Sequence, residues 1–160
     1  KLGMVPNVIL ANASDQDRLK NFVNFYNRLM LKEGYLSKLE REMIAVVVSS
    51  CNKCFYCLIA HGAAVRQLSK NQYLGDELMI NYRSASLNKR HKLMLDFSFK
   101  LTENPSKVDN SDRNILREAG FSEEEILEIV EVASFFNMSN RIAAGTDMRP
   151  NAEYHNMGRE

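Results

Sequence analysis

All three cysteines of this 160-residue chain lie within seven consecutive positions, and a histidine follows four residues after the last one. They are Cys51, Cys54 and Cys57, followed by His61, in the mostly apolar segment REMIAVVVSSCNKCFYCLIAHGAAVR. Sulfur and imidazole at such short spacing allow three kinds of site: a buried structural cluster, a metal site or a redox-active dithiol.

The spacing disfavours a structural zinc site, whose ligands usually form two pairs a dozen or so residues apart. Here the four candidate ligands would lie along one turn and one helix, three, three and four residues apart. His91 and His155 have no companion ligands nearby in the sequence. A c-type haem is excluded because Leu58 occupies the position where C-x-x-C-H requires histidine. We therefore expect no metal and no other cofactor.

The redox interpretation needs a thiolate, a partner sulfur and a base. The sequence CFYC, residues 54 to 57, stands at the start of a predicted helix, so both sulfurs lie on one face. The free amides at a helix N-terminus stabilise a thiolate. His61 lies one turn beyond Cys57 and would serve that sulfur as a base, unless it is an ordinary core histidine. Thioredoxin is not indicated, because its βαβ context is missing around the motif.

Helical periodicity dominates the chain and predicts an all-α fold with no credible strand series. The predicted helices cover residues 15–31, 37–50, 54–69, 76–82, 88–102, 111–119 and 123–146. Ser37 to Glu40 and Ser122 to Glu125 are capping boxes that open two of them. The apolar helices 37–50 and 123–146 are expected at the centre, and the tail after residue 148 has no clear period.

Composition excludes several classes of protein. With 45% apolar and 26% charged residues, residues 1–160 suit a single globular domain, and a net charge of +1 gives no field that would attract nucleic acid. The longest strongly apolar run, Met43 to Val48, is far below the roughly 20 residues that a bilayer requires. An odd number of cysteines favours a reducing cytoplasm. Because the chain begins at Lys1, we expect it to be a piece of a longer product that lacks an N-terminal segment.

Geometry also relates a carboxylate to the histidine. Helices 37–50 and 54–69 are joined by about three residues, which favours an antiparallel hairpin. Glu42 would then lie about 12 Å, and His61 about 10 Å, from the turn, at nearly the same height. From the helix position alone, Glu42 is better interpreted as a solvated charge near a helix start.

These residues form the pattern E-x11-C-x2-C-x3-H, made by Glu42, Cys54, Cys57 and His61. The pattern resembles the signature of the alkylhydroperoxidase AhpD and carboxymuconolactone decarboxylase superfamily. Three further stretches resemble its branch of uncharacterised peroxidase-related proteins: GMVPNV from Gly3, LEREMIAV from Leu39 and FNMSNR from Phe136.

The resemblance implies an AhpD-like helical domain with the C-x-x-C motif at the start of a central helix, assembled as a dimer or a multiple of dimers. It implies a thiol peroxidase in which Cys57 attacks the peroxide and Cys54 resolves the sulfenic acid as a disulfide. His61 is then the base, and Glu42 holds its ring in a proton relay. Some members carry a second histidine where this chain has Tyr56.

The implied partners are a peroxide substrate and an external dithiol reductant, which would attack at the outer Cys54. Cys51 lies outside the signature and is interpreted as a buried bystander that stays free. Two alternatives remain at this stage. One is a carboxymuconolactone decarboxylase-like enzyme, although the intact cysteine pair argues against it, and the other is a non-catalytic redox-sensing oligomer.

Overall fold

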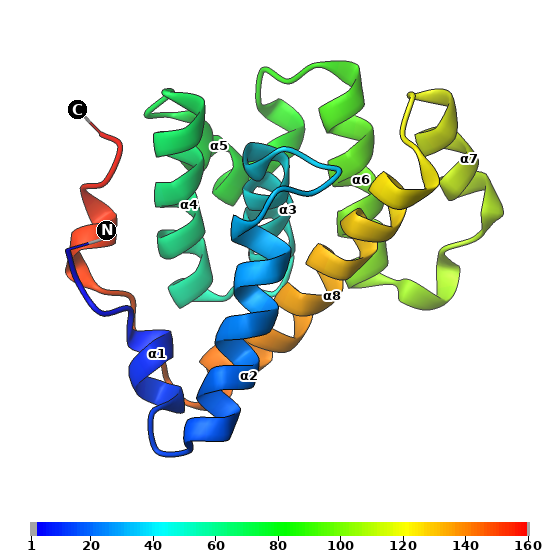
Figure 1. The fold of residues 1–160 in the computed structure, drawn as a ribbon. Helices are drawn as coiled ribbons and strands as arrows, with labels where there is room; N and C mark the ends of the chain where they lie inside the picture. Colours follow the sequence, from blue (N-terminus) through cyan, green and yellow to red (C-terminus); the bar gives the residue numbers. More distant parts are fainter. Residues whose placement is uncertain (1–2, 160) are drawn as a thin grey trace.

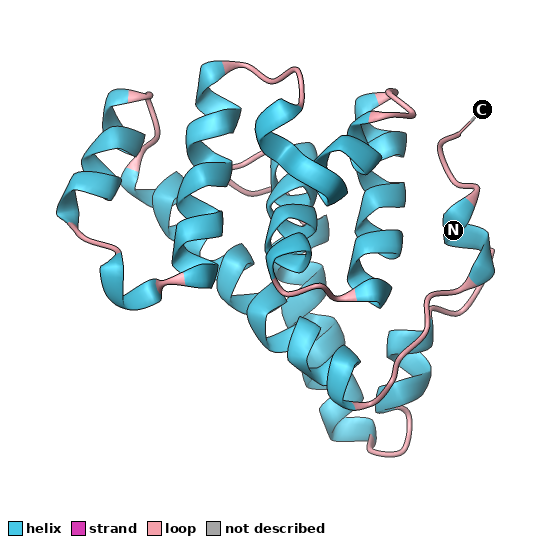
Figure 2. Cartoon of the chain, turned by 180° about the vertical axis from the view of Figure 1, so that it is seen from behind, coloured by secondary structure: helices cyan, strands magenta, loops and turns pink. Residues whose placement is uncertain are grey.

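A computed structural model describes residues 3–159, and within that range the chain is helical and contains no strand (Figures 1 and 2). The α-helices are α1 (Asn7–Asn12), α2 (Gln16–Tyr26), α3 (Lys38–Cys51), α4 (Phe55–Ser69), α5 (Leu74–Asn81), α6 (Lys89–Glu103), α7 (Asn110–Glu118) and α8 (Glu123–Gly145). Short elements are the π-helix η1 (Asn27–Leu31) and the 3-10 helices η2 (Tyr82–Ser84), η3 (Pro105–Lys107) and η4 (Ala152–His155). The predicted all-α fold is confirmed. No helix of the described range combines the length and apolarity needed to cross a bilayer.

Helix α3 lies at the centre of the fold, where it packs against α4, α5, α6 and α8. Every residue from Glu40 to Ser49 is buried, including the charged residues Glu40, Arg41 and Glu42, because other helices surround this one. Its start is the predicted capping box, in which Ser37 and Glu40 exchange side-chain and backbone hydrogen bonds. The local sequence therefore determines where the central helix begins.

Helix α8 runs obliquely across the molecule from α7 towards α1 and α2 (Figure 1). It packs on α3 and α6 and reaches α4 and η1. Its predicted capping box, Ser122 with Glu125, is also confirmed. Because α8 contacts both α3 and α4, it forms one wall of the space beside the cysteine segment.

The first predicted helix, 15–31, has the expected extent, but its last turn is a π-helix rather than an α-helix. The N–H of Lys32 donates to the carbonyl of Asn27, 3.0 Å away. Buried Arg41 donates from one nitrogen to the carbonyls of Leu29 (2.7 Å) and Lys32 (2.9 Å). An arginine of another helix thus satisfies the carbonyl groups at the end of this helix, and hydrophobic periodicity alone does not predict such a contact.

Two short elements, α1 and η4, were not predicted, and they stabilise each other across the chain. The Asn7 N–H donates to the Asn151 side chain (2.8 Å), whose amide nitrogen donates to the Val5 carbonyl (3.0 Å). Buried Arg66 of α4 donates to the carbonyl of Tyr154 (3.0 Å). These long-range bonds order a tail that has no hydrophobic period of its own.

Candidate functional site

The link between α3 and α4 is a tight turn held against α8. Lys53 has a left-handed φ of 55°, which turns the chain so that α4 runs back along α3. The side-chain nitrogen of Asn52 donates to the side-chain oxygens of Asn137 (3.1 Å) and Asn140 (2.9 Å). Asn52 thus fixes this turn against α8, and Cys54 follows it at the beginning of α4.

The cysteine pair occupies the first turn of α4. Cys54 is the N-cap of that helix in an extended conformation, and Cys57 is its third residue. Both are free thiols and almost fully buried, at 3% and 1% exposure. Cys51 is the last residue of α3 and is half-buried, and burial raises its pKa. It does not belong to the cavity described below.

The two sulfurs of the pair differ in acidity. Hydrogen bonding from the Cys57 side chain lowers the pKa of Cys54 to about 6, although burial acts in the opposite direction. The same hydrogen bond, together with burial, raises the pKa of Cys57. Cys54 is therefore the more acidic thiol of the reduced pair, and Cys57 is the one that holds its proton more tightly.

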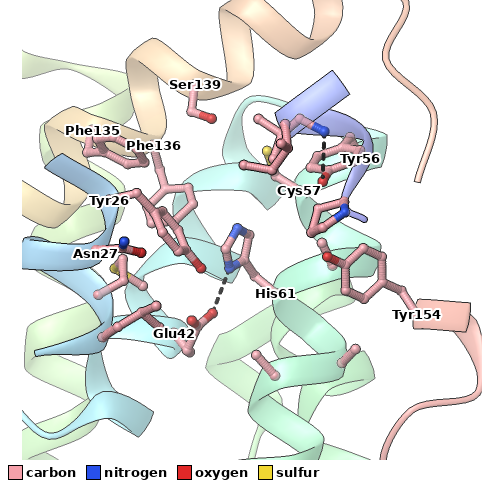
Figure 3. A pocket seen from close by; sticks show the side chains of 18 of the residues that line it. Tyr26, Asn27, Glu42, Tyr56, Cys57, His61, Phe135, Phe136, Ser139 and Tyr154 are labelled. Atoms are coloured by element: carbon pink, nitrogen blue, oxygen red, sulfur yellow. Dashed lines mark hydrogen bonds and ion pairs between the residues drawn. The ribbon is translucent and has the colours of Figure 1, made fainter. Parts of the chain in front are cut away.

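His61 and Glu42 form a short, buried pair between the two helices of the hairpin (Figure 3). The distance from His61 Nδ1 to Glu42 Oε2 is 2.6 Å, with side-chain exposures of 11% and 7%. The edge of the His61 ring also packs against Phe136, with ring centroids 4.5 Å apart. A carboxylate only accepts hydrogen bonds, so Nδ1 is the donor in this pair, and Nε2 is the ring nitrogen left to exchange a proton with a neighbouring group. The predicted equal height of these two residues is confirmed.

A cavity of about 530 Å³ opens beside this pair, within the range of small-molecule sites. Cys57, His61 and Glu42 line it, whereas Cys54 does not. The remaining walls come from α1, α2, η1, α8, η4, the segment after η4 and further residues of α3 and α4, and they are mainly apolar. They include Val8, Ile9, Phe22, Val23, Met30, Leu31, Phe135, Phe136 and Met157. The cavity thus offers an apolar substrate direct access to one sulfur.

Three tyrosines add hydroxyl groups to this apolar surface: Tyr26, Tyr56 and Tyr154. The Tyr26 hydroxyl points towards His61 and Glu42 in Figure 3. Burial, reinforced by the charge of Glu42, raises the pKa of Tyr26 well above its usual value. Burial also raises the pKa values of the other two phenols. All three therefore remain protonated at neutral pH and can donate hydrogen bonds into the cavity.

The structure brings together the four residues singled out from the sequence, but sequence reasoning missed much of the site. Tyr26 lies in the predicted helix 15–31, and nothing in the local sequence marks it as part of a site. Tyr154 lies in the aperiodic tail. His155 contacts Phe55 and His91 lies near Glu40, and neither lines the cavity.

No ligand set for a metal ion is formed within residues 3–159, where no three side chains of histidine, cysteine, aspartate or glutamate converge suitably. Cys54, Cys57 and His61 follow one helix, as their spacing predicted. The chemistry that the arrangement offers is that of a dithiol with an adjacent acid–base pair.

Comparisons with known proteins identify a matching family and similar folds. Residues 16–72 match the sequence model of the carboxymuconolactone decarboxylase family. The chain is similar to an uncharacterized peroxidase-related protein from Silicibacter sp. TM1040, with 56% identity and a TM-score of 0.97. It is also similar to one from Ralstonia eutropha JMP134, described as an alkylhydroperoxidase AhpD core, with 42% identity and a TM-score of 0.95. Each comparison covers 99% of this chain and 83% of the other.

A more distant similarity concerns the fold alone. The debrominase Bmp8, in one structure bound to 2,3,4-tribromopyrrole, is 20% identical, with a TM-score of 0.84. That comparison covers 98% of this chain and 82% of the other. No curated protein sequence matches the chain significantly.

Proposed function

Because the chain belongs to the carboxymuconolactone decarboxylase family, in its AhpD-like, peroxidase-related branch, we propose that it is a thiol-dependent peroxidase. Its cycle would interconvert the Cys54/Cys57 dithiol and disulfide. The observation that carries the proposal is the position of Cys57, at the wall of a ligand-sized apolar cavity and beside the His61–Glu42 pair. The volume of about 530 Å³ and the apolar lining suit an organic hydroperoxide.

The first step oxidises Cys57. His61 Nε2 accepts the Cys57 proton, and the resulting thiolate attacks the terminal peroxide oxygen. An S–O bond forms as the O–O bond breaks, leaving Cys57 as a sulfenic acid. The departing alkoxide takes the proton from His61 and leaves as an alcohol. Glu42 supports the transient imidazolium by accepting its Nδ1–H.

The second step forms the disulfide. The Cys54 thiolate, already present at neutral pH because its pKa is lowered to about 6, attacks the Cys57 sulfur. Hydroxide leaves and takes up a proton to become water. The low pKa of Cys54 in the reduced pair is consistent with a resolving role, since the thiolate is the form that attacks a sulfenic sulfur. An external dithiol then returns both cysteines to the reduced state.

This ordering assigns peroxide attack to the less acidic sulfur, and the reason is access. Only Cys57 lines the cavity and lies one helical turn from His61. Acidity alone would select Cys54, as in thioredoxin-like proteins. The two assignments differ in which cysteine forms the sulfenic acid, so they can be separated experimentally.

The test is consumption of cumene hydroperoxide with dithiothreitol as reductant, compared between the wild type and Cys57→Ala. We expect turnover only in the wild type, and mass mapping should find a Cys54–Cys57 disulfide with Cys51 free. In Cys54→Ser, dimedone should label Cys57. Equal turnover in the wild type and Cys57→Ala would reject the proposal, and a dominant Cys51–Cys54 bridge would reject the assignment of roles.

A further inference from the structure

A second cavity, separate from the first, lies on the other side of the first turn of α4. It has a volume of about 150 Å³, below the roughly 300 Å³ at which small-molecule sites begin. Lys53 and Cys54 form one side of it, and Ala144, Asp147 and Arg149, at and beyond the end of α8, form the other. The two cavities therefore reach different sulfurs of the same dithiol.

Among residues 3–159, Tyr56 alone lines both cavities. It stands between the two cysteines in the sequence, is 5% exposed and accepts a hydrogen bond from the Val8 N–H (3.4 Å). A buried side chain fixed in this way separates the space beside Cys57 from the space beside Cys54. A molecule in the large cavity does not block the small one.

From this arrangement we infer that the small cavity beside Cys54 is the entrance for the thiol of a dithiol reductant, distinct from the peroxide entrance. The inference rests on the proposed peroxidase cycle for its physiological meaning. The path itself does not depend on that cycle, because it states only that a thiol reaches the Cys54 sulfur of the disulfide from the end of α8. The small volume suits a single thiol on a slender arm and excludes a bulky apolar substrate.

The reductive step follows from which sulfur is accessible. A thiolate of the reductant attacks the sulfur of Cys54, forming a mixed disulfide as the Cys54–Cys57 bond breaks. The electron pair goes to the sulfur of Cys57, which takes up a proton beside His61. The second thiol of the reductant then attacks its own sulfur in the mixed disulfide and releases the Cys54 thiolate. The dithiol loses two electrons and two protons and leaves as a disulfide.

The pKa values of the two cysteines are consistent with attack of the reductant on Cys54 and departure of Cys57. The pKa of Cys57 is raised mainly by its hydrogen bond with Cys54, and this cause disappears when Cys54 is held in a mixed disulfide. Cys57 is then a better leaving group than it appears in the reduced pair. On release, Cys54 leaves as a thiolate readily, because its pKa is lowered to about 6 once Cys57 again donates to it.

The entrance also has a defined electrostatic character. Arg149 and Asp147 form an exposed ion pair, 3.1 Å apart, on the α8 side. Lys53 on the opposite side adds a further positive charge. The rim therefore carries one net positive charge and does not repel a reductant that approaches as a thiolate.

The same substitution in the two cavities tests the inference. Ala144, exposed on α8, lines the small cavity, and Ala64, half-buried on α4, lines the large one. The disulfide is first made with diamide, so that no peroxidase activity is needed, and its reduction by dithiothreitol is followed by thiol titration. Oxidation of the reduced protein by cumene hydroperoxide is measured separately.

Ala144→Phe should slow reduction by about tenfold or more and change oxidation by less than about twofold, because it obstructs only the Cys54 side. Ala64→Phe should slow oxidation and leave reduction within about twofold of the wild type. A smaller variant, Ala144→Leu, should give an intermediate effect on reduction if Ala144→Phe melts early. Unchanged reduction in both Ala144 variants, or equal slowing of reduction by Ala64→Phe, would overturn the inference. Failure of wild-type oxidation alone would count against the proposed peroxidase and leave the entrance intact.

Discussion

Replacing Glu42 by glutamine is the sharpest test of the acid–base pair. The side chain keeps its size but loses the charge that lies 2.6 Å from Nδ1 of His61. A carboxylate can only accept a hydrogen bond, whereas an amide can also donate one. Glutamine can therefore present its NH₂ group to Nδ1 and move the imidazole proton to Nε2, where it prevents the ring from accepting the Cys57 proton.

The magnitude follows from the kind of hydrogen bond that is lost. A bond to a charged group contributes roughly 1.5–3 kcal/mol, and each 1.4 kcal/mol corresponds to about tenfold in rate. Because the pair is buried, little of this is recovered from solvent. Oxidation of Cys57 in Glu42→Gln should therefore slow by roughly 10- to 150-fold, with the fold retained.

The assay isolates the oxidative step. Reduced protein is mixed rapidly with cumene hydroperoxide, quenched with N-ethylmaleimide, and analysed by mass for the Cys54–Cys57 disulfide. The matched control is Glu131→Gln, the same substitution at an exposed glutamate of α8. It should oxidise at the wild-type rate. An undiminished rate in Glu42→Gln, with an unchanged melting temperature, would refute the relay, and equal slowing in the control would assign the effect to net charge.

Three further outcomes follow from other contacts. Glu128→Ala should lower the free energy of unfolding by about 3–5 kcal/mol, because it leaves the buried Arg41 without its carboxylate partner. The control Glu131→Ala, on the same helix, should change this free energy by less than about 0.5 kcal/mol in chemical denaturation. Tyr26→Phe should slow oxidation by cumene hydroperoxide by roughly 2- to 10-fold, because the departing oxygen loses one hydrogen-bond donor. An unchanged rate would show that the Tyr26 hydroxyl takes no part in the reaction and that the ring only lines the cavity. Iodoacetamide labelling of Cys54 should have its midpoint near pH 6 and move towards pH 9 in Cys57→Ala, since removing the donor to the thiolate raises its pKa; an unmoved midpoint would contradict this origin of the acidity.

Local sequence was sufficient for most of the helices. Capping boxes at Ser37 and Ser122 act within four residues, so the starts of α3 and α8 could be predicted from their residue types. Cys54, Cys57 and His61 lie within two helical turns, so their placement along one helix could be predicted without tertiary information. The link of three residues between α3 and α4 was short enough to predict that Glu42 lies opposite His61, because so short a link favours antiparallel helices.

Contacts between distant segments decided the rest. The π-helical turn of η1 is stabilised by Arg41, which donates to it from α3. The hydrophobic period of 3.6 residues in the sequence gives no information about this hydrogen bond. Tyr154 enters the cavity because Arg66 holds its backbone, from 88 positions away in the sequence. Such contacts depend on the whole fold and not on local preference.

By itself, the sequence determined which residues could do chemistry and that two cysteines, a histidine and a glutamate share one hairpin. The tertiary structure alone decided that Cys57 faces a large apolar cavity and Cys54 a small one. The physical reason is that access depends on what surrounds each sulfur, and those surroundings come from α1, α2, α8 and η4, segments far from the motif along the chain.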